Sequence, residues 1–358
     1  MDLYLAIDCG GTKTAAVLCT PNGTIVAHAS GGGSNFTSLG LDAFLKRIGE
    51  VTSSALSTAL QSPVIITPPA DAKARINITG AGTPPYNLRA AWLGVAGVDS
   101  PSAASLLLPH VSKLLSVPVE RLLISNDTHL LAAPLRVLPD VRTAVAVVAG
   151  TGSNVVSFRE GTADAPLEAL ARVGGWGWIL GDEGSGFDVG RTAVRALLAQ
   201  QDVETTGVVV ANGPLKEKLL KKFGVNEVMD LLAVVYAPDS TSALPHEGRL
   251  SSLCPIVFEA AFEDGDPLAI NVVRDCAHKL AMQIAAVLHA SEQEEHPRKI
   301  RADSSVLCLG GSLCGIDRYR ELVLSTLKES GHVFRHVKVV GDAAEMGARA
   351  LVAAWNGK

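Results

Sequence analysis

With 358 residues, 47% of them hydrophobic, the chain is long enough to bury a sizeable core and predicts two domains. Its formal net charge of −5 and its dispersed basic residues, apart from a short lysine run at 216–222 that is typical of a solvated helix face, argue against a nucleic-acid partner. No stretch is apolar over the length that spans a bilayer and no basic leader opens the chain, so we expect a cytoplasmic protein without a membrane partner.

The first part of the chain is predicted to form a mixed α/β domain. Apolar runs with strand character come first, and segments of helical periodicity then alternate with further strands. The expected strands are 3–8, 15–18, 25–29, 92–95 and 122–125, and the expected helices are 41–60, 101–115 and 128–138. The stretch 63–86 is rich in proline and has little periodic apolar signal, which indicates a surface insertion.

The same order begins again in the second part, where two strands surround another glycine-rich turn. Asp266 followed by Pro267 predicts the start of a long helix, and its stripe of apolar residues predicts a core-facing side. The expected strands are 143–148, 155–159, 306–309 and 335–340, and the later helices are 317–328 and 343–354. This alternation predicts an α/β fold, with two halves that each begin with a Gly-Thr turn between strands.

The first candidate site is the string DCGGTKT, which follows the first expected strand. Gly10 and Gly11 would let backbone N–H groups approach phosphate oxygens, Thr12 can donate its hydroxyl, and Lys13 can supply positive charge. Asp8 can reach a magnesium ion directly or through water. A plain β-hairpin turn can have the same composition, so this string alone leaves both interpretations open.

The second candidate is the string AGTGSN, which contains Thr151 and Gly152 and has the same strand-turn-strand setting. Two phosphate hairpins that face each other across a nucleotide are typical of the actin, sugar-kinase and Hsp70 ATPase superfamily. The pair of turns therefore favours ATP as a ligand more strongly than either turn does.

A carboxylate stands between the two turns, where Asp127 follows a buried strand. One interpretation is that Asp127 caps the helix that comes next. The other is that it acts as a general base and accepts the proton of a hydroxyl group that attacks a γ-phosphoryl group.

The densest motif is GGWGWILGDEGSG at residues 174–186. It combines bare backbone, flat apolar rings and the adjacent carboxylates Asp182 and Glu183. This mixture suits a sugar, whose C–H groups pack on a hydrophobic face and whose hydroxyls need hydrogen-bond acceptors. The alternative is that its two tryptophans simply pack in the core.

The strings DCGGTKT, GGGSNF, SNDTH, AGTGSN, GGWGWILGDEGSG and CLGGSL, in this order, resemble those of N-acetylglucosamine kinases of the BadF/BadG/BcrA/BcrD ATPase family. The resemblance spans nearly the whole chain. It implies two ribonuclease-H-like, actin-like ATPase domains with an interdomain cleft, one at 1–138 completed by the C-terminal helix 343–358 and the other at 139–342. It also implies a homodimer.

The resemblance implies an ATP-dependent kinase that uses Mg²⁺ to phosphorylate the 6-hydroxyl of N-acetyl-D-glucosamine in amino-sugar salvage. Asp127 would be the catalytic aspartate, and Asp99 would lie near the acceptor. The implied ATP and phosphate contacts are Gly10, Gly11, Thr12, Lys13, Thr151, Gly152, Gly310, Gly311 and Ser312. The implied sugar contacts are Asn35, Asp127, Ser153, Asn154, Gly175, Trp176 and Asp182.

Several alternatives stay open within this resemblance. Phe36 and Trp178 depart from the pattern of some relatives, so the acceptor can also be glucosamine, glucose, N-acetylmannosamine or a muramyl sugar. A sugar-binding regulator without turnover is another reading. The related activators of 2-hydroxyacyl-CoA dehydratases hold an iron–sulfur cluster through paired cysteines. The six cysteines here show neither CxxC pairing nor zinc-ligand spacing and are expected to be reduced structural thiols.

Overall fold

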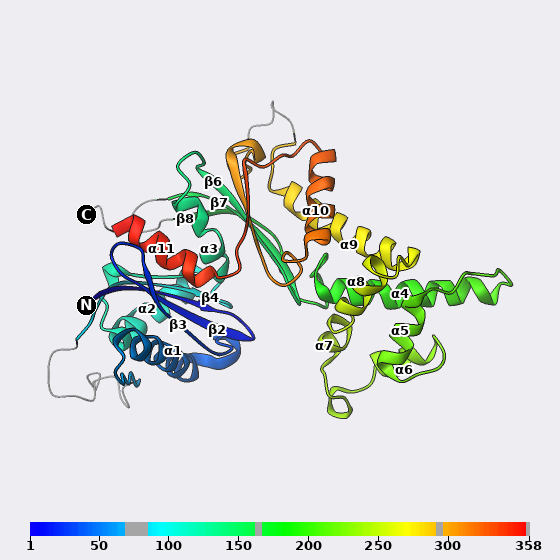
Figure 1. The fold of residues 1–358 in the computed structure, drawn as a ribbon, viewed down its shortest axis with the longest axis horizontal. Helices are drawn as coiled ribbons and strands as arrows, with labels where there is room; N and C mark the ends of the chain where they lie inside the picture. Colours follow the sequence, from blue (N-terminus) through cyan, green and yellow to red (C-terminus); the bar gives the residue numbers. More distant parts are fainter. Residues whose placement is uncertain (69–84, 162–166, 291–295, 356–358) are drawn as a thin grey trace. The chain divides into compact units, whose positions relative to one another are not determined.

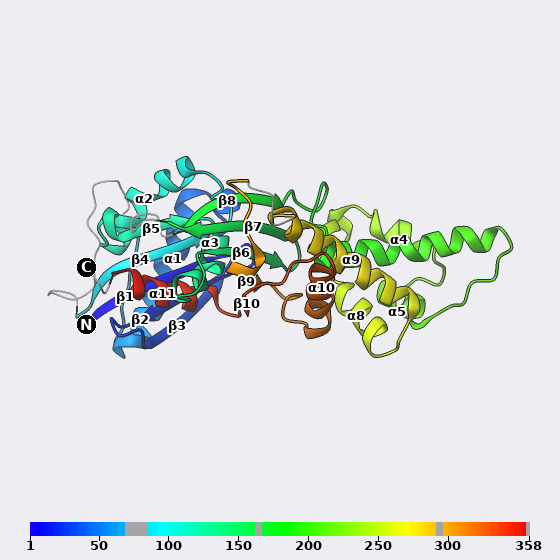
Figure 2. The same ribbon diagram turned by 90° about the horizontal axis from the view of Figure 1, so that it is seen from above.

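The computed structural model describes residues 1–68, 85–161, 167–290 and 296–355, and the chain forms two compact units (Figures 1 and 2). Unit 1 comprises residues 1–146, 158–169 and 340–358, and unit 2 comprises residues 147–157 and 170–339. The domain limits and the cleft expected above stay predictions.

Unit 1 is built on a five-stranded sheet with the order β3-β2-β1-β4-β5. Its strands are β1 (Asp2–Cys9), β2 (Lys13–Cys19), β3 (Ile25–Gly32), β4 (Asn87–Val95) and β5 (Leu122–Ser125). The first three strands are antiparallel, whereas β4 runs parallel to both β1 and β5. The central strand β1 is apolar on both faces, which is expected when helices cover both sides of a sheet.

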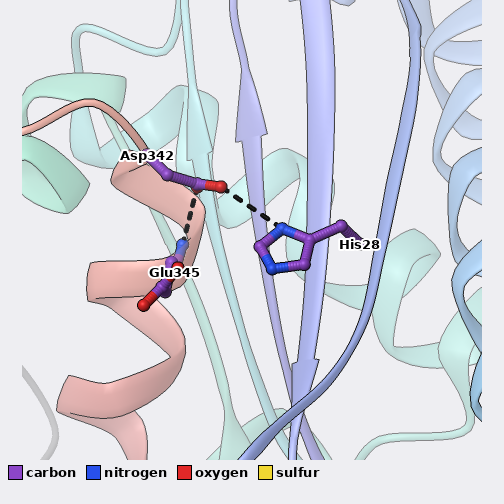
Figure 3. Close-up of side chains that lie close together, drawn as sticks. All are labelled: His28, Asp342 and Glu345. Carbon is purple, nitrogen blue, oxygen red and sulfur yellow. Dashed lines mark hydrogen bonds and ion pairs between the residues drawn. The ribbon is translucent and has the colours of Figure 1, made fainter.

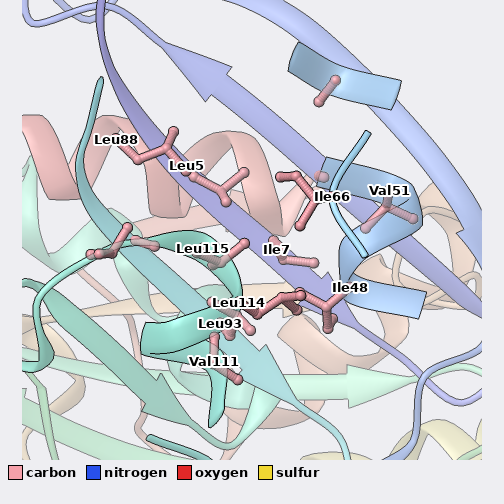
Figure 4. Close-up of a cluster of buried hydrophobic side chains, with 14 of the residues drawn as sticks. Leu5, Ile7, Ile48, Val51, Ile66, Leu88, Leu93, Val111, Leu114 and Leu115 are labelled. Carbon is pink, nitrogen blue, oxygen red and sulfur yellow. The ribbon is translucent and has the colours of Figure 1, made fainter. Parts of the chain in front are cut away.

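Helices cover each face of this sheet. On one face, Leu5 and Ile7 of β1 pack in a core with side chains of α1 (Phe36–Leu60) and α2 (Pro101–Leu115), as Figure 4 shows. On the other face lie α3 (Asp127–Leu131) and α11 (Ala343–Trp355). There, a Cβ at Gly347 would lie 2.3 Å from Leu130 and 3.3 Å from Ala6, so only glycine lets α11 approach so closely.

The second sheet repeats the strand order of the first. Its strands are β6 (Thr143–Ala149), β7 (Ser153–Glu160), β8 (Leu167–Gly174), β9 (Ser305–Gly310) and β10 (His336–Val339). They follow the order β8-β7-β6-β9-β10, in which the first strand of the set is again central. Residues of β6, β7 and β8 belong partly to each unit. The two sheets confirm the predicted α/β fold and the predicted internal repetition of its plan.

The remainder of unit 2 is helical. Its helices are α4 (Gly186–Thr205), α5 (Pro214–Phe223), α6 (Asp230–Val235), α7 (His246–Ser251), α8 (Cys254–Phe262), α9 (Pro267–Ala286) and α10 (Asp317–Glu329). The long helix α9 packs against α4, α8 and α10. Asp266 caps α9 as predicted, since its carboxylate accepts hydrogen bonds from the N–H groups of Leu268 and Ala269.

The structure corrects one predicted helix and adds the strand β8, which was not predicted. The helix expected at 128–138 ends at Leu131 and is followed by a 3₁₀ turn at Ala133–Arg136. Pro134 explains the break, because it has no N–H and disfavours the helical conformation of the preceding residue. The expected insertion at 63–86 lies mostly outside the described residues.

Two further observations concern the cysteines and the hydropathy of the helices. All six cysteines are buried and free, as expected of structural thiols. Within the described ranges, no helix is both long enough and apolar enough to cross a membrane.

Candidate active site

The first glycine-rich turn, residues 10–12 (turn 1), joins β1 to β2 as predicted. Gly10 N donates to Lys13 O over 3.0 Å and closes the turn. Gly33 at the end of β3 lies directly against it, since a Cβ at residue 33 would be 2.0 Å from Gly11 O. Ser34 N adds a 2.9 Å hydrogen bond to Gly10 O. The string GGGSNF therefore supports turn 1 from behind and leaves Gly11 exposed to a ligand.

Carboxylates from three elements gather beside turn 1. Asp8 is the second-last residue of β1, and its burial, together with the negative charges of Asp127 and Asp342, raises its pKa to about 7, against an opposing effect of Lys13. Asp127 comes from α3, and Asp342 immediately precedes α11. Carboxylate oxygens are the ligands that a hard divalent cation such as Mg²⁺ prefers, so Asp8 is a candidate ligand. Sequence reasoning missed Asp342, which no glycine motif marks.

Asp342 is held in place by its neighbours (Figure 3). His28 Nδ1 lies 3.4 Å from one Asp342 oxygen, and Glu345 N donates to the other over 2.8 Å. Ligand atoms of these three residues lie within 4.8 Å of one another, a spacing that can suit a metal. However, Arg349 donates two hydrogen bonds to Glu345 Oε1, at 2.9 and 3.0 Å, and neutralises it. The cluster is best described as an ion-pair network that fixes the start of α11.

The helix after β5 is capped by Asn126 and not by Asp127. Asn126 Oδ1 accepts hydrogen bonds from Thr128 N at 3.1 Å and from Thr128 Oγ1 at 2.7 Å. Its amide nitrogen donates to Asp99 Oδ1 over 3.0 Å. The capping interpretation of Asp127 is therefore wrong, and Asp127 is the first helical residue instead.

Asn35 lies beside the loop that carries Asp99. It caps α1, with Oδ1 accepting from Ser38 N at 3.2 Å and from Thr37 Oγ1 at 2.7 Å. Gly97, with φ of +85°, passes so close that a Cβ there would lie 2.9 Å from Asn35 Oδ1. Capping occupies the oxygen of Asn35, so a ligand would be contacted through its amide N–H groups.

His129 follows Asp127 closely but points into the core. Its ring packs edge-on against Phe158 with centroids 4.7 Å apart. Burial lowers the pKa of His129 to about 4, although a hydrogen bond from the ring to the backbone carbonyl of Asn126 acts in the other direction. A neutral, packed ring is the structural role expected of this histidine.

The second turn, residues 150–152 (turn 2), joins β6 to β7 and rests on the start of α4. Gly150 N donates to Gly152 O over 2.9 Å. From α4, Gly186 N donates to Gly150 O at 2.8 Å, and Phe187 N donates to Thr151 O at 3.1 Å. The end of the GGWGWILGDEGSG motif thus builds the helix that supports the second turn.

The predicted nucleotide residues 310–312 pack on the same turn. Gly311 has φ of +90°, and a Cβ there would lie 2.3 Å from Ala149 O. Leu313 N also donates to Ala149 O, over 3.0 Å. The structure therefore brings Gly311 and Ser312 against Ala149 and Gly150, backbone against backbone, at the start of turn 2.

Asp182 connects turn 2 to residues 174–185, which carry Trp176 and Trp178 and are called the tryptophan loop below. Its Oδ1 accepts a 3.2 Å hydrogen bond from Ser153 N, and a Cβ at Gly152 would lie 2.9 Å from its Oδ2. Asp182 has φ of +60°, a left-handed conformation that is uncommon and strained for a residue with a side chain. Burial raises the pKa of Asp182, while the bond from Ser153 opposes this. Ser153 Oγ donates to Glu183 O at 2.7 Å, so the loop and the strand hold each other.

The two tryptophans of the loop have different surroundings. Trp178 packs edge-on against Phe187 and lies parallel to the ring of His246, with centroids 5.7 and 6.4 Å away. Trp176 is 67% exposed. The core-packing alternative is therefore wrong for Trp176, whose ring is available to a ligand, and Trp178 is half-buried beside two rings and not part of the core.

Asn154 and Gly175 meet beside Trp176. Gly175 has φ of +68°, and a Cβ there would lie 3.0 Å from Asn154 Oδ1. That oxygen is buried and has no hydrogen-bond partner among the described residues. A buried acceptor without a partner costs free energy unless a bound group donates to it. A sugar hydroxyl or amide N–H would satisfy Asn154.

The far end of the loop is anchored through Gly184. Its N–H donates to the buried Asp188 over 3.0 Å, and its carbonyl accepts from the Tyr319 hydroxyl at 2.7 Å. Asp188 also pairs with Arg191 at 2.7 Å. A Cβ at Gly184 would lie 2.6 Å from Leu280, so the loop approaches α9 as closely as backbone can. These contacts make the loop a fixed platform.

Sequence reasoning missed one further acidic residue. Burial raises the pKa of Glu247, and the charge of Asp182 raises it further. Glu247 belongs to α7, far along the chain from the loop, and no motif in the sequence marks it.

The structure places the predicted site residues in two sets, one in each unit. Unit 1 holds Asp8, Gly10, Gly11, Thr12, Lys13, Asn35 and Asp127, and unit 2 holds Thr151, Gly152, Ser153, Asn154, Gly175, Trp176, Asp182, Gly310, Gly311 and Ser312. Their roles toward ligands stay predictions.

Known proteins resemble this chain over most of its length. A model of the BadF/BadG/BcrA/BcrD ATPase family matches residues 5–348. The chain is 27% identical over 288 residues to an N-acetyl-D-glucosamine kinase of Dictyostelium discoideum, covering 80% of this chain and 79% of that protein. It is 24% identical over 290 residues to an N-acetylmuramic acid/N-acetylglucosamine kinase of Clostridium acetobutylicum, covering 80% of each.

Solved structures show the same fold. A protein from Porphyromonas gingivalis, provisionally named an N-acetylglucosamine kinase, has a TM-score of 0.64 at 20% identity and covers 99% of both chains. A provisionally named N-acetylglucosamine kinase from Chromobacterium violaceum has a TM-score of 0.59 at 22% identity, covering 99% of this chain and 98% of that one. At these identities the likeness shows a shared fold.

Proposed function

Because the chain belongs to the BadF/BadG/BcrA/BcrD ATPase family, we propose that it is an ATP-dependent kinase that phosphorylates the 6-hydroxyl of N-acetyl-D-glucosamine. The observation that carries the proposal is the position of Asp127. The negative charge of Asp127 helps to raise the pKa of Asp8 beside turn 1, and Asn126 rather than Asp127 caps the helix. A carboxylate next to a phosphate-binding turn is what a kinase needs to accept a proton from a hydroxyl acceptor.

In the proposed reaction, Asp127 accepts the proton of the sugar 6-hydroxyl as its oxygen attacks the γ-phosphorus of ATP. The new bond joins the sugar oxygen to phosphorus, and the bond from phosphorus to the bridging oxygen breaks. ADP leaves with that electron pair. Backbone N–H groups of turn 1 and turn 2 would bind the phosphates, since their glycines leave the backbone accessible.

Asp8 is the residue that we assign to magnesium, directly or through water. A carboxylate whose pKa is raised to about 7 by burial and by two neighbouring acids would be held ionised by a nearby divalent cation. When bound, Mg²⁺ neutralises phosphate charge. Asp342 stands next to this group and would help to set its charge.

The acceptor sugar is assigned to residues of the tryptophan loop and its neighbours. Asn154 Oδ1 is the buried acceptor that lacks a partner among the described residues, and Trp176 offers an exposed ring to the C–H face of a pyranose. Asp182 and Ser153 are held in fixed positions beside them. The names of both curated relatives include N-acetylglucosamine, which supports that acceptor over glucose, glucosamine and N-acetylmannosamine.

A coupled ADP-release assay with Mg-ATP and these sugars, together with N-acetylmuramic acid, tests the proposal. We expect N-acetylglucosamine to give the highest kcat/KM. Asp127→Asn should lower kcat by about 10² to 10⁴ while ATP still binds, because only proton transfer is lost. Asp317→Asn, which removes an exposed carboxylate at the start of α10, is the control and should keep wild-type rates.

The outcomes separate the alternatives. Turnover led by another sugar would keep the mechanism and change the acceptor. Sugar binding without turnover of any sugar would identify a regulator. A fully active Asp127→Asn enzyme would show that another group is the base.

The homodimer and the role in amino-sugar salvage stay predictions that the family resemblance implies, and the cytoplasmic location stays a prediction from the sequence. Sedimentation of the purified chain would test the first of them.

A further inference from the structure

Helix α7 is clamped against the start of α4, which follows the tryptophan loop. At residue 190 of α4, a Cβ would lie 1.9 Å from Leu250 O, so the two helices touch through backbone. At the other end of α7, the ring of His246 lies parallel to Trp178, with an interplanar angle of 5°. Asp239 holds His246 through both its ring, at 2.7 Å, and its backbone N–H, at 2.9 Å. Glu247 stands between these two contacts.

Arg249 makes the position of α7 rigid. Its buried guanidinium donates to the carbonyl oxygens of Leu244 at 2.9 Å and Val235 at 3.0 Å, and it pairs with Asp239 at 2.8 Å. A short helix would otherwise fray, but a buried side chain with several hydrogen bonds ties it to the preceding loop. Arg249 therefore fixes the backbone that carries Glu247, a half-buried residue, beside the loop.

The loop itself already carries two acids. Asp182 is buried and fixed by Ser153 N, and the main-chain oxygen of Glu183 accepts from Ser153 Oγ at 2.7 Å and from Gln283 Nε2 at 2.9 Å.

His246, the residue before Glu247, stacks on Trp178 of the tryptophan loop, which brings the start of α7 to the loop. The negative charge of Glu183 raises the pKa of Asp182, and that of Asp182 raises the pKa of Glu247, in agreement with this placement. Like charges around a binding position exclude ligands of the same charge.

We propose that Glu247 is a specificity-determining residue that excludes acceptor sugars carrying a carboxylate, and so restricts this enzyme to uncharged or cationic hexosamines. The inference rests on the proposed kinase function and on the loop as the acceptor site. A sugar that differs from N-acetylglucosamine by an acidic ether substituent would bring its carboxylate into the field of Asp182, Glu183 and Glu247.

Two arginines stand near the loop, and the charge of Arg191 offsets part of the negative field at Asp182. Arg191 pairs with Asp188 at 2.7 Å and lies over the Phe187 ring. Arg172 is exposed and donates to Gly175 O over 2.9 Å. If Arg172 turned to pair with a sugar carboxylate, it would offset the acids, so the experiment must be able to reveal that outcome.

The test compares N-acetylmuramic acid, which is anionic, with N-acetylglucosamine, which is neutral, in the full-length enzyme with Mg-ATP. Glu247→Gln keeps the shape and removes the charge, Glu247→Asp keeps the charge, and Glu321→Gln removes an exposed charge from α10. The measured quantity is the ratio of kcat/KM for the anionic sugar to that for the neutral sugar. N-acetylmuramic acid is also measured as a competitive inhibitor, so that weak turnover does not hide binding.

We expect Glu247→Gln to raise this ratio about tenfold at low salt, mainly through KM and the inhibition constant, and less in 0.5 M salt. Glu247→Asp and Glu321→Gln should keep the wild-type ratio. Turnover of N-acetylglucosamine with an unchanged ratio in Glu247→Gln would overturn the inference alone. A wild-type enzyme that prefers the anionic sugar would overturn it in favour of Arg172. Absence of turnover with both sugars would overturn the kinase proposal and the inference with it.

Discussion

Turn 1 and turn 2 share a backbone plan but differ in the side chains around them. Each is a three-residue turn between the first two strands of its sheet in chain order. Each is closed by a hydrogen bond that the N–H of its first glycine donates. The second-last residue of the preceding strand is Asp8 in one case and Val148 in the other. Only turn 1 therefore has a carboxylate immediately before it.

The two turns are also supported differently. Turn 1 is backed by Gly33, which directly follows β3, whereas turn 2 is held by the first N–H groups of α4 and by Gly311. The positive end of a helix and exposed amides favour an anion without side-chain charge. We therefore propose that the two turns have different roles, with the acid chemistry beside turn 1 in unit 1 and backbone contacts to the phosphates at turn 2 in unit 2.

The largest expected effect comes from removing the acid that distinguishes turn 1. Asp8→Asn should lower Mg-ATP turnover on the order of 10²-fold, because the group assigned to the cation is lost. Without magnesium, the same change should stabilise the protein at pH 8 by about 4 kcal/mol, since the buried carboxylate no longer has to ionise. Asp2→Asn, at the exposed start of the same strand, is the matched control.

The pH dependence follows from the direction of the shift. The pKa of Asp8 is about 7 in the folded protein, above its ordinary value of 3.8, so the folded state binds the extra proton between these values. The stability that it contributes is complete below pH 4 and is lost as the pH rises through 7. Urea unfolding of Asp8→Asn and wild type should therefore converge at pH 4. A variant less stable than wild type at pH 8 would contradict this account.

The next effect tests whether the glycines behind the turns act through packing. Gly33→Ala and Gly311→Ala would place a methyl group 2.0 Å from Gly11 O and 2.3 Å from Ala149 O. Each should cost about 2 kcal/mol of unfolding free energy and raise KM for ATP about tenfold. Urea unfolding and ADP release measure the two quantities.

Glycines inside the turns are the matched comparison. A Cβ at Gly11 meets nothing within 4 Å, and one at Gly150 has its nearest neighbour at 3.9 Å. Gly11→Ala and Gly150→Ala should keep the stability of the wild type and change KM for ATP alone. Equal loss of stability in all four variants would show that the turns are rigid for reasons other than this packing.

Much of this plan could be predicted from local sequence. The strand at 122–125 and the helix at 101–115 were predicted with their observed limits, because a short apolar run and a proline at the first helical position are local signals. Both glycine turns lie between strands as predicted. Strand β8 escaped notice because it is an edge strand with several exposed side chains and hence little apolar alternation.

The residues that were missed depend on contacts between distant segments. Asp342 matters because its charge acts on Asp8, which lies on another element. Glu247 matters because the charge of Asp182, on a loop far before it in the chain, acts on it. Asn126 was passed over because an aspartate and an asparagine can both cap a helix, and sequence alone does not say which one does. A motif search finds residues that recur together along the chain, whereas these residues meet only in the fold.

The smallest expected effect separates the caps of the helices beside the two turns. Asn126→Ala should cost about 1 kcal/mol of unfolding free energy and lower kcat several-fold, because it frees the start of α3 that carries Asp127. Ser185→Ala at the start of α4 should cost about as much but act on KM for ATP, since α4 supports turn 2.

This difference in the kinetic constant is the informative result. Asn126→Asp retains an acceptor for Thr128 N but loses the amide donor to Asp99, so it shows whether capping or the Asp99 contact positions Asp127. If Asn126→Ala abolished turnover as completely as Asp127→Asn, the two residues could not be assigned separate roles. If both cap variants changed only KM for ATP, unit 1 would not be the place of the acid chemistry, and the division between the turns would have to be abandoned.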